Sequence, residues 1–182
     1  RQDPDIILVG EIRDITTGGI AVKAAQTGHM VMSTLHTNDG PQTLTRLQDM
    51  GVQSFAVATS INLITAQRLL RRLNPENRVE IEMPDDALRK EDFPEEMIKA
   101  GMQLYGPGEE TEDNPGYKGR AGIYQVMPIS ENLKRLIIEE ANAVQLADQA
   151  AKEGVWDIRR SGLQKVADGI TSLAEVNRVT VE

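Results

Sequence analysis

Side chains that could act on a nucleotide phosphate lie near the start of the chain, beside two short apolar segments. Glu11 follows Gly10 directly after the apolar run at 6–9, and the only two histidines of the sequence, His29 and His36, bracket a second apolar run at 30–35. In open α/β sheets, ligands bind at the edge formed by the carboxyl ends of the strands. A carboxylate there can hold Mg²⁺, or a water on Mg²⁺, against phosphates, and a glycine lets the backbone approach closely. The pattern therefore predicts a phosphate site around Glu11.

The positions of the two histidines predict different roles for them. Seven residues of straight strand span about 23 Å, so His29 and His36 cannot both reach one phosphate from the same chain. His36 follows the strand on the same edge as Glu11, which makes it the candidate on the nucleotide side. His29 lies at the opposite edge, where a structural role stays open beside a functional one. Gly10 and Glu11 after an apolar run also fit a strand that simply ends in a turn.

Apolar periodicity predicts a strand, a helix and a second strand around these side chains. The run Ile6–Val9 suits a strand that is buried on both faces. Residues Thr16–Thr27 fit a helix that ends at Gly28, and Met30–Leu35 fits the second strand. This order predicts parallel pairing of the two strands with a right-handed crossover.

Most of the later elements are predicted as helices. Helices are expected over Thr43–Met50 and Ser54–Leu73, and arginines near the end of the second would complement its dipole. A strand is expected over Arg120–Met127. Three or four amphipathic helices fit the residues from Ser130 onward, and Ser172–Glu175 has the pattern of a capping box for the last one.

Composition and charge exclude several classes of protein. The 182 residues are 40% apolar and include no cysteine, which excludes disulfides and thiolate chemistry in this chain. No apolar stretch approaches the length of a membrane span. Segment 74–119 holds 13 acidic and 5 basic side chains and so carries the whole net charge of −8. An acidic chain without a basic stripe speaks against nucleic-acid binding, because phosphate contacts supply most of that affinity. The five prolines of this segment predict a loop-rich insertion with one short helix near Glu95–Ala100.

Two sequence boxes resemble those of the secretion ATPase superfamily. Residues 1–14, Arg-Gln-Asp-Pro-Asp-Ile-Ile-Leu-Val-Gly-Glu-Ile-Arg-Asp, resemble its atypical Walker B box, and residues 28–38 resemble its His box. Residues 38–47 and 66–69, together with two C-terminal stretches at 162–166 and 169–176, are most similar to pilus assembly ATPases of the PilB type. The resemblance covers nearly the whole chain apart from about 78–107.

The resemblance implies roles for the residues named above. It implies a Walker B carboxylate at Glu11 that acts on Mg²⁺ and water, with Gly10 beside the nucleotide, and a γ-phosphate sensor at His36. Arg1 and Arg13 match arginines that can line a subunit interface, where His29 is a further candidate. In this superfamily, ATP binds between the subunits of a six-membered ring, and its hydrolysis moves a platform protein of the inner membrane. The resemblance thus implies a cytoplasmic protein at the periphery of the bacterial inner membrane.

The expected fold class is α/β. Segment 1–73 is predicted as the C-terminal portion of a RecA-like P-loop NTPase core, with the Walker B and His-box strands. Segment 74–119 is predicted as the acidic insertion, and 120–182 as a mostly helical C-terminal subdomain. A type II secretion ATPase is the alternative within the class. An alternative of another class is a docking module whose acidic insertion binds a PilZ-type regulator.

The chain departs from its relatives at a metal site. Most relatives carry two Cys-x-x-Cys pairs, and the corresponding positions here are Asn74, Asn77, Glu109 and Glu112. These side chains offer oxygen and amide groups, whereas a tetrahedral zinc site requires mainly cysteine or histidine. We therefore expect no zinc, with local packing in its place, although a hard cation is a further possibility for such donors.

The resemblance also predicts that the isolated 182-residue chain does not hydrolyse ATP. In the family, the glycine-rich loop whose backbone amides hold the β- and γ-phosphates precedes the Walker B box. The expectation is that this chain begins after that loop. Phosphate release by the purified chain is the measurement, and steady turnover would contradict the prediction.

Overall fold

The computed structural model describes residues 4–180, which divide into two compact units. Unit 1 takes its described residues from the stretch up to Ala66 and from Gln125–Val155, and unit 2 takes them from Gln67–Tyr124 and from Trp156 onward. The units thus interleave along the chain, whereas the predicted parts 1–73, 74–119 and 120–182 follow one another. Those three parts were defined by expected roles, and that division stays a prediction.

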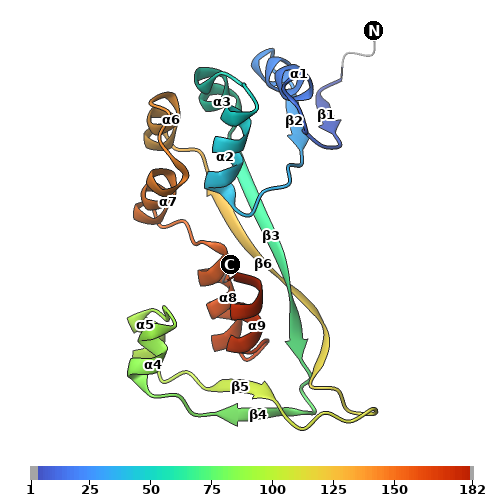
Figure 1. The fold of residues 1–182 in the computed structure, drawn as a ribbon, viewed down its shortest axis with the longest axis vertical. Coiled ribbons are helices and arrows are strands. Elements are labelled where there is room, and N and C mark those ends of the chain that lie inside the picture. The colour runs from blue at the N-terminus through green and yellow to red at the C-terminus, as the bar shows by residue number, and fades with distance from the viewer. Residues whose placement is uncertain (1–3, 181–182) are drawn as a thin grey trace. The chain divides into compact units, whose positions relative to one another are not determined.

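Unit 1 begins with the predicted strand, helix and strand (Figure 1). Strand β1 (Ile6–Val9) pairs in parallel with β2 (Met30–Ser33), and helix α1 (Ile15–Gln26) connects them. Asp14 caps α1 by accepting a 2.8 Å hydrogen bond from the backbone N–H of Thr17. This bond lowers the pKa of the Asp14 carboxyl. The predicted strands, helix and parallel pairing are all confirmed.

Burial of this strand pair differs from the prediction. Side chains alternate along both strands, and Ile6, Leu8, Met30 and Met32 are exposed on one face. Val9 and Val31, on the other face, pack against the core of unit 1. The prediction of burial on both faces is therefore wrong for the described residues. The reason is that the core of unit 1 covers only one face of the pair.

Four more helices complete unit 1. They are α2 (Gly40–Asp49), α3 (Ser54–Ser60), α6 (Glu131–Ile138) and α7 (Ala143–Lys152). Helix α3 contacts α1, α2 and α6, and α7 contacts α2 and α6. The core between them is aliphatic and includes Leu44, Val57, Leu133, Ile137 and Leu146, all without exposed area. Burial of one apolar face per helix is what holds these short helices in place.

The predicted long helix over 54–73 is wrong in its second part. The chain leaves α3 at Ile61 in an extended conformation and forms strand β3 (Leu63–Leu73), which pairs with β6 (Tyr117–Pro128). Leucine, arginine and glutamine favour helices in isolation, which explains the prediction. Pairing with β6 makes this segment a strand instead. In β6 itself, every second side chain from Ile123 to Met127 is buried: Ile123, Gln125 and Met127. The strand predicted over 120–127 is confirmed.

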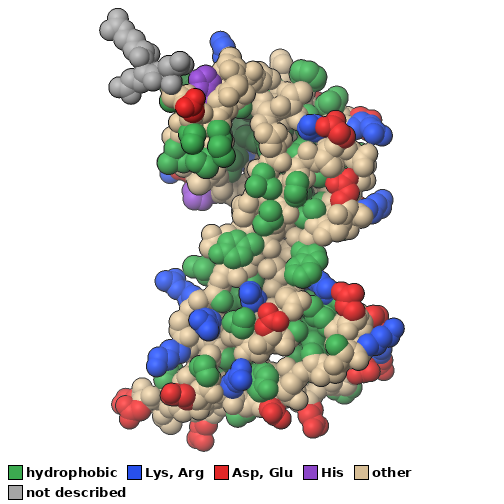
Figure 2. All heavy atoms as spheres, turned by 180° about the vertical axis from the view of Figure 1, so that it is seen from behind, with side chains coloured by type: hydrophobic (Ala, Val, Ile, Leu, Met, Phe, Trp, Pro, Cys, Tyr) green, Lys and Arg blue, Asp and Glu red, His purple; other side chains and the backbone are tan. Residues whose placement is uncertain are grey.

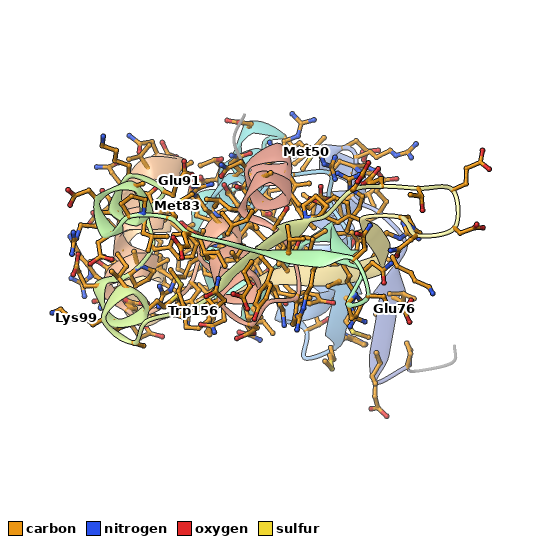
Figure 3. The ribbon with its side chains drawn as sticks, turned by 90° about the horizontal axis from the view of Figure 1, so that it is seen from below. Met50, Glu76, Met83, Glu91, Lys99 and Trp156 are labelled. Atoms are coloured by element: carbon orange, nitrogen blue, oxygen red, sulfur yellow. The ribbon has the colours of Figure 1, made fainter. Side chains whose placement is uncertain are left out.

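Unit 2 contains the acidic segment, which has more regular structure than predicted. Strands β4 (Arg78–Ile81) and β5 (Leu104–Pro107) form an antiparallel pair, and α4 (Asp85–Lys90) and α5 (Glu95–Lys99) lie between them in the chain. Only α5 was predicted. Two arginines of α8 (Ile158–Ala167) hold this segment. Arg159 donates to Glu91, labelled in Figure 3, at 3.1 Å, and Arg160 donates to Glu96 at 2.7 Å.

The last described helix, α9 (Leu173–Thr180), is fixed by a buried carboxylate. Glu175 has no exposed area and accepts hydrogen bonds of 2.7–3.0 Å from the guanidinium groups of Arg71 and Arg178, and from the Arg71 backbone N–H. Half of the predicted capping box is present, since Ser172 accepts from the Glu175 N–H at 3.2 Å. With α6, α7 and α8, this helix confirms the prediction of three or four helices after Ser130. None of the helices in residues 4–180 combines the length and apolar character that crossing a bilayer requires.

Glu175→Gln is expected to destabilise unit 2 by about 1–3 kcal/mol. This range allows for solvent screening of the ion pairs, because Arg71 and Arg178 are both about half exposed. Burial raises the pKa of Glu175, but hydrogen bonds from Arg178 and Arg71 outweigh it and hold the pKa at about 2, against 4.5 ordinarily. The lowered pKa contributes stability above pH 4.5 that is lost as the pH falls towards 2. Denaturant titration followed by fluorescence of Trp156, the only tryptophan and part of unit 2, measures this. Glu131→Gln, which removes an exposed ion pair with Lys134, is the control. Equal loss in both variants, or no difference between pH 7 and pH 3, would contradict the prediction.

Candidate functional site

Glu11, Arg13 and His36 come together at the carboxyl ends of β1 and β2. The Oε1 atom of Glu11 lies 2.6 Å from Nε2 of His36, and its Oε2 atom accepts a 2.5 Å hydrogen bond from Nε of Arg13. The sequence predicted that Glu11 and His36 share this edge, and the structure places them there. Arg13 was predicted only as an interface candidate, and it is bonded directly to the carboxylate.

The three side chains differ in exposure. Glu11 is 21% exposed, whereas Arg13 is 77% and His36 is 89% exposed. The Oε1 atom of Glu11 is itself buried, and its short contact with His36 lacks hydrogen-bond geometry. This oxygen therefore keeps an unused acceptor, which is costly for a buried polar atom unless a ligand or cation uses it. A carboxylate oxygen in this state fits Mg²⁺, which takes one or two carboxylates and fills its shell with water and phosphate oxygens.

Backbone and hydroxyl groups next to these side chains fix the geometry. The Thr34 hydroxyl donates to the Gly10 carbonyl at 2.8 Å, and the Ile12 N–H donates to the Thr34 carbonyl at 2.9 Å. These bonds extend the β1–β2 pairing beyond the last strand residues. No described atom lies within 4 Å of the position a Cβ would take at Gly10, apart from its chain neighbours. Among the described residues, Gly10 thus contributes its carbonyl to this geometry, and no neighbouring atom requires the absence of a side chain there.

The segment that carries His36 is anchored at its far end by the start of α2. Asp39 caps α2 by accepting from the Gln42 N–H at 2.8 Å, and the Thr37 and Thr43 hydroxyls lie 2.7 Å apart. The N–H of Gly40 donates to the side-chain oxygen of Gln125 at 2.8 Å. The segment is therefore fixed on both sides of His36, while the His36 side chain itself stays exposed.

His29 lies at the other end of β2, as the strand spacing predicted. Its Nδ1 atom is 3.0 Å from the Ala24 carbonyl and 3.1 Å from the Thr27 hydroxyl, both at the end of α1. In Figure 2 the two histidines, in purple, flank a patch of hydrophobic side chains in unit 1. His29 thus contacts α1 and does not join the Glu11 cluster. Arg1, the other interface candidate, lies outside the described residues.

The four positions expected to replace metal ligands divide into two groups. Asn74 is 3% exposed and donates to the Asn114 side-chain oxygen and the Pro115 carbonyl, both at 2.9 Å. Asn77 donates to the Asn114 carbonyl at 2.8 Å and to the Glu109 carbonyl at 3.1 Å. The side chains of Glu109 and Glu112 are not part of this amide cluster of Asn74, Asn77 and Asn114. Amide hydrogens of Asn74 and Asn77 thus join the two loops.

Three contributors to these sites were missed by the sequence analysis. They are the Thr34 hydroxyl, the Asn114 side chain and Gln125. Thr34 lies inside a recognised box, so a hydroxyl next to the strand end was a usable signal. Asn114 and Gln125 act on residues 40 and 85 positions away, and no local pattern indicates such a pairing.

Comparison with known proteins finds a match over nearly the whole chain. A family model described as type II/IV secretion system protein matches residues 1–178. The chain belongs to this family. The match confirms the resemblance that the two boxes predicted. The secretion-family chain spans about a third of the length of the curated relatives it matches.

Among those relatives, the type IV pilus assembly ATPase PilB of Pseudomonas aeruginosa is 57% identical over 180 residues, which are 99% of this chain and 32% of the relative. The type II secretion system ATPase E of Vibrio cholerae serotype O1 is 42% identical over 183 residues, which are 100% of this chain and 36% of the relative. A crystal structure of the pilus retraction motor PilT with bound ADP matches with a TM-score of 0.68 at 21% identity, over 100% of this chain and 41% of that one. That likeness establishes a mixed α/β fold shared with that structure.

We expect no stoichiometric zinc in this protein, and the amide cluster should carry the stability of the two loops. Asn74→Asp replaces two donated hydrogens by an acceptor facing two other acceptors, so it should destabilise unit 2 by about 2 kcal/mol or more. Glu112→Gln, at an exposed position of the same four, should change stability by less than about 0.5 kcal/mol. Elemental analysis and unfolding with and without a chelator are the measurements. One zinc per chain, or equal effects of both variants, would contradict this assignment.

Proposed function

We propose that this chain is part of a hexameric P-loop ATPase that powers assembly of a type IV pilus. The observation that carries the proposal is the Glu11–His36 contact at the carboxyl edge of β1 and β2, in a chain 57% identical to a pilus assembly ATPase. We assign β1 to a Walker B strand and β2 to a His-box strand of a RecA-like core. The substrate is ATP, and the metal is Mg²⁺.

Each side chain of the cluster then has a distinct task. Glu11 would hold Mg²⁺, or a water bound to it, and Mg²⁺ when bound would neutralise phosphate charge. His36 contacts the γ-phosphate, a role that its exposed ring supports because it can turn towards a ligand. Arg13 balances the charge of Glu11 from the solvent side. Because Arg13 is largely exposed, it could also contact a neighbouring subunit. We propose the same for Arg1 and His29.

The proposal extends to location and partners. The full-length protein would act as a homo-hexamer in the cytoplasm, at the periphery of the inner membrane, against a pilus platform protein. A PilZ-type regulator is a further partner that the acidic segment 74–119 would suit, and nucleic acid is not a proposed partner. A type II secretion ATPase is the second candidate, favoured by the identity to the Vibrio cholerae protein. Loss of pili rather than loss of protein export in a deletion strain would favour the first.

In the full-length protein, Glu11→Gln should lower kcat on the order of 100-fold while nucleotide affinity changes much less. The variant keeps the shape of the side chain and removes the charge used in the transition state. His36→Ala should lower kcat about tenfold, within the range for one positioned polar group, and His29→Ala should lower it less. Steady-state turnover and nucleotide titration measure both quantities.

Glu131→Gln, a change in an exposed ion pair of the same unit, serves as the control. Near-normal turnover of Glu11→Gln would show that Glu11 only ends a strand. A larger effect at His29 than at His36 would contradict the assignment of the nucleotide edge.

A further inference from the structure

The side chain of Gln125 is buried in unit 1 and bonded to the start of another element. It is 4% exposed, and its Oε1 atom accepts the N–H of Gly40, the first residue of α2, at 2.8 Å. The first N–H groups of a helix have no partner inside the helix. Asp39 serves the Gln42 N–H at this end of α2, so Gln125 supplies an acceptor that the local cap does not.

The contact between β6 and the start of α2 is close. A Cβ at Gly40 would lie 2.8 Å from Cε of Met127 and 3.2 Å from Oε1 of Gln125. A side chain at Gly40 would therefore force the end of the Met127 side chain to move and would crowd Oε1 of Gln125. The absence of a Cβ brings the backbone within hydrogen-bond reach of Gln125, which sets the position of this helix end.

The same helix end holds one side of the segment that carries His36. This segment, residues 34–39, is held to β1 by the Thr34 hydroxyl and the Ile12 N–H, and to α2 by the Thr37–Thr43 contact and the cap at Asp39. His36 lies between these two anchors and contacts Glu11. Because its ring is exposed, packing does not hold it, and its placement depends on the backbone on either side.

We propose that Gln125 is a positioning residue for His36. By fixing the Gly40 N–H, it holds the second anchor of segment 34–39 and keeps His36 within reach of Glu11 and of the nucleotide. This inference rests on the proposed function for the role of His36. Gln125 does not touch the nucleotide, so its loss acts through the backbone of the segment.

A purely structural role for Gln125 would predict only a loss of stability, and helix α2 offers a matched comparison. Gln48 lies near the other end of α2 and donates from Nε2 to the Ser54 hydroxyl and to the Ile137 carbonyl, both at 3.0 Å. Gln125 and Gln48 thus each form a hydrogen bond between one end of α2 and another element of unit 1. Only Gln125 ties the end that follows His36.

The test compares Gln125→Met, Gln125→Glu and Gln48→Met with the unchanged full-length protein. Gln125→Met keeps the length of the side chain and removes the acceptor, whereas Gln125→Glu keeps an acceptor oxygen at the same reach. Backbone hydrogen exchange over residues 34–43 is followed by mass spectrometry, together with kcat and KM for ATP.

Gln125→Met is expected to speed exchange over 34–43 at least tenfold and to lower kcat/KM at least fivefold. Gln125→Glu should stay within threefold of the unchanged protein in both. Gln48→Met should match Gln125→Met in thermal stability without changing exchange over 34–39 or kcat/KM. Unchanged exchange over 34–43 in Gln125→Met, or equal kinetic loss in Gln48→Met, would overturn the inference. The proposed function fails separately, if the unchanged full-length protein releases no phosphate from ATP.

Discussion

The candidate site depends on the register of two short parallel strands. Residues Ile6–Val9 face Met30–Ser33 one to one, and the Thr34 and Ile12 bonds continue this register past the strand ends. A slip of one residue would turn each side chain to the other face of the pair, because the side-chain period of a strand is two. Glu11 and His36 would then no longer meet. Because their contact is made outside the strands, it requires both the register and the bonds that extend it.

Two glutamates show how the surroundings decide what a buried carboxylate can do. Glu175 accepts from two guanidinium groups and a backbone N–H, so both its oxygens are used and its low pKa keeps it charged. Glu11 receives one arginine on one oxygen, while the other is buried, lies 2.6 Å from Nε2 of His36 and accepts no hydrogen bond. A saturated carboxylate joins secondary-structure elements, and an unsaturated one can take a ligand. One glutamate thus joins elements of unit 2, while the other, in unit 1, keeps an oxygen available for the proposed ligand.

Local patterns predicted the parts of the structure that local forces determine. Apolar spacing and the glycine after it were sufficient for β1, α1 and β2, and they placed Glu11 and His36 on one edge. The strand β3 was predicted as a helix because Leu69, Leu70 and Arg71 are good helix formers and β6 lies about 50 residues further on. The acidic segment was predicted as mostly loop for the same reason, since two of the arginines that pair with it, Arg159 and Arg160, belong to α8. Long-range pairing is what a single sequence does not display.

The amide cluster of Asn74, Asn77 and Asn114 shows how hydrogen bonds alone can join two loops. A metal joins loops through lone pairs, so each ligand must be an acceptor and the junction fails when the metal leaves. An asparagine offers two N–H donors and one acceptor, so it can bond directly to the carbonyls of the opposite loop. Asn74 and Asn77 do this with Asn114, Pro115 and the Glu109 carbonyl. The carboxylates at Glu109 and Glu112 have no such donors, and Glu109 takes part through its backbone carbonyl, which accepts from Asn77. These hydrogen bonds all lie within unit 2.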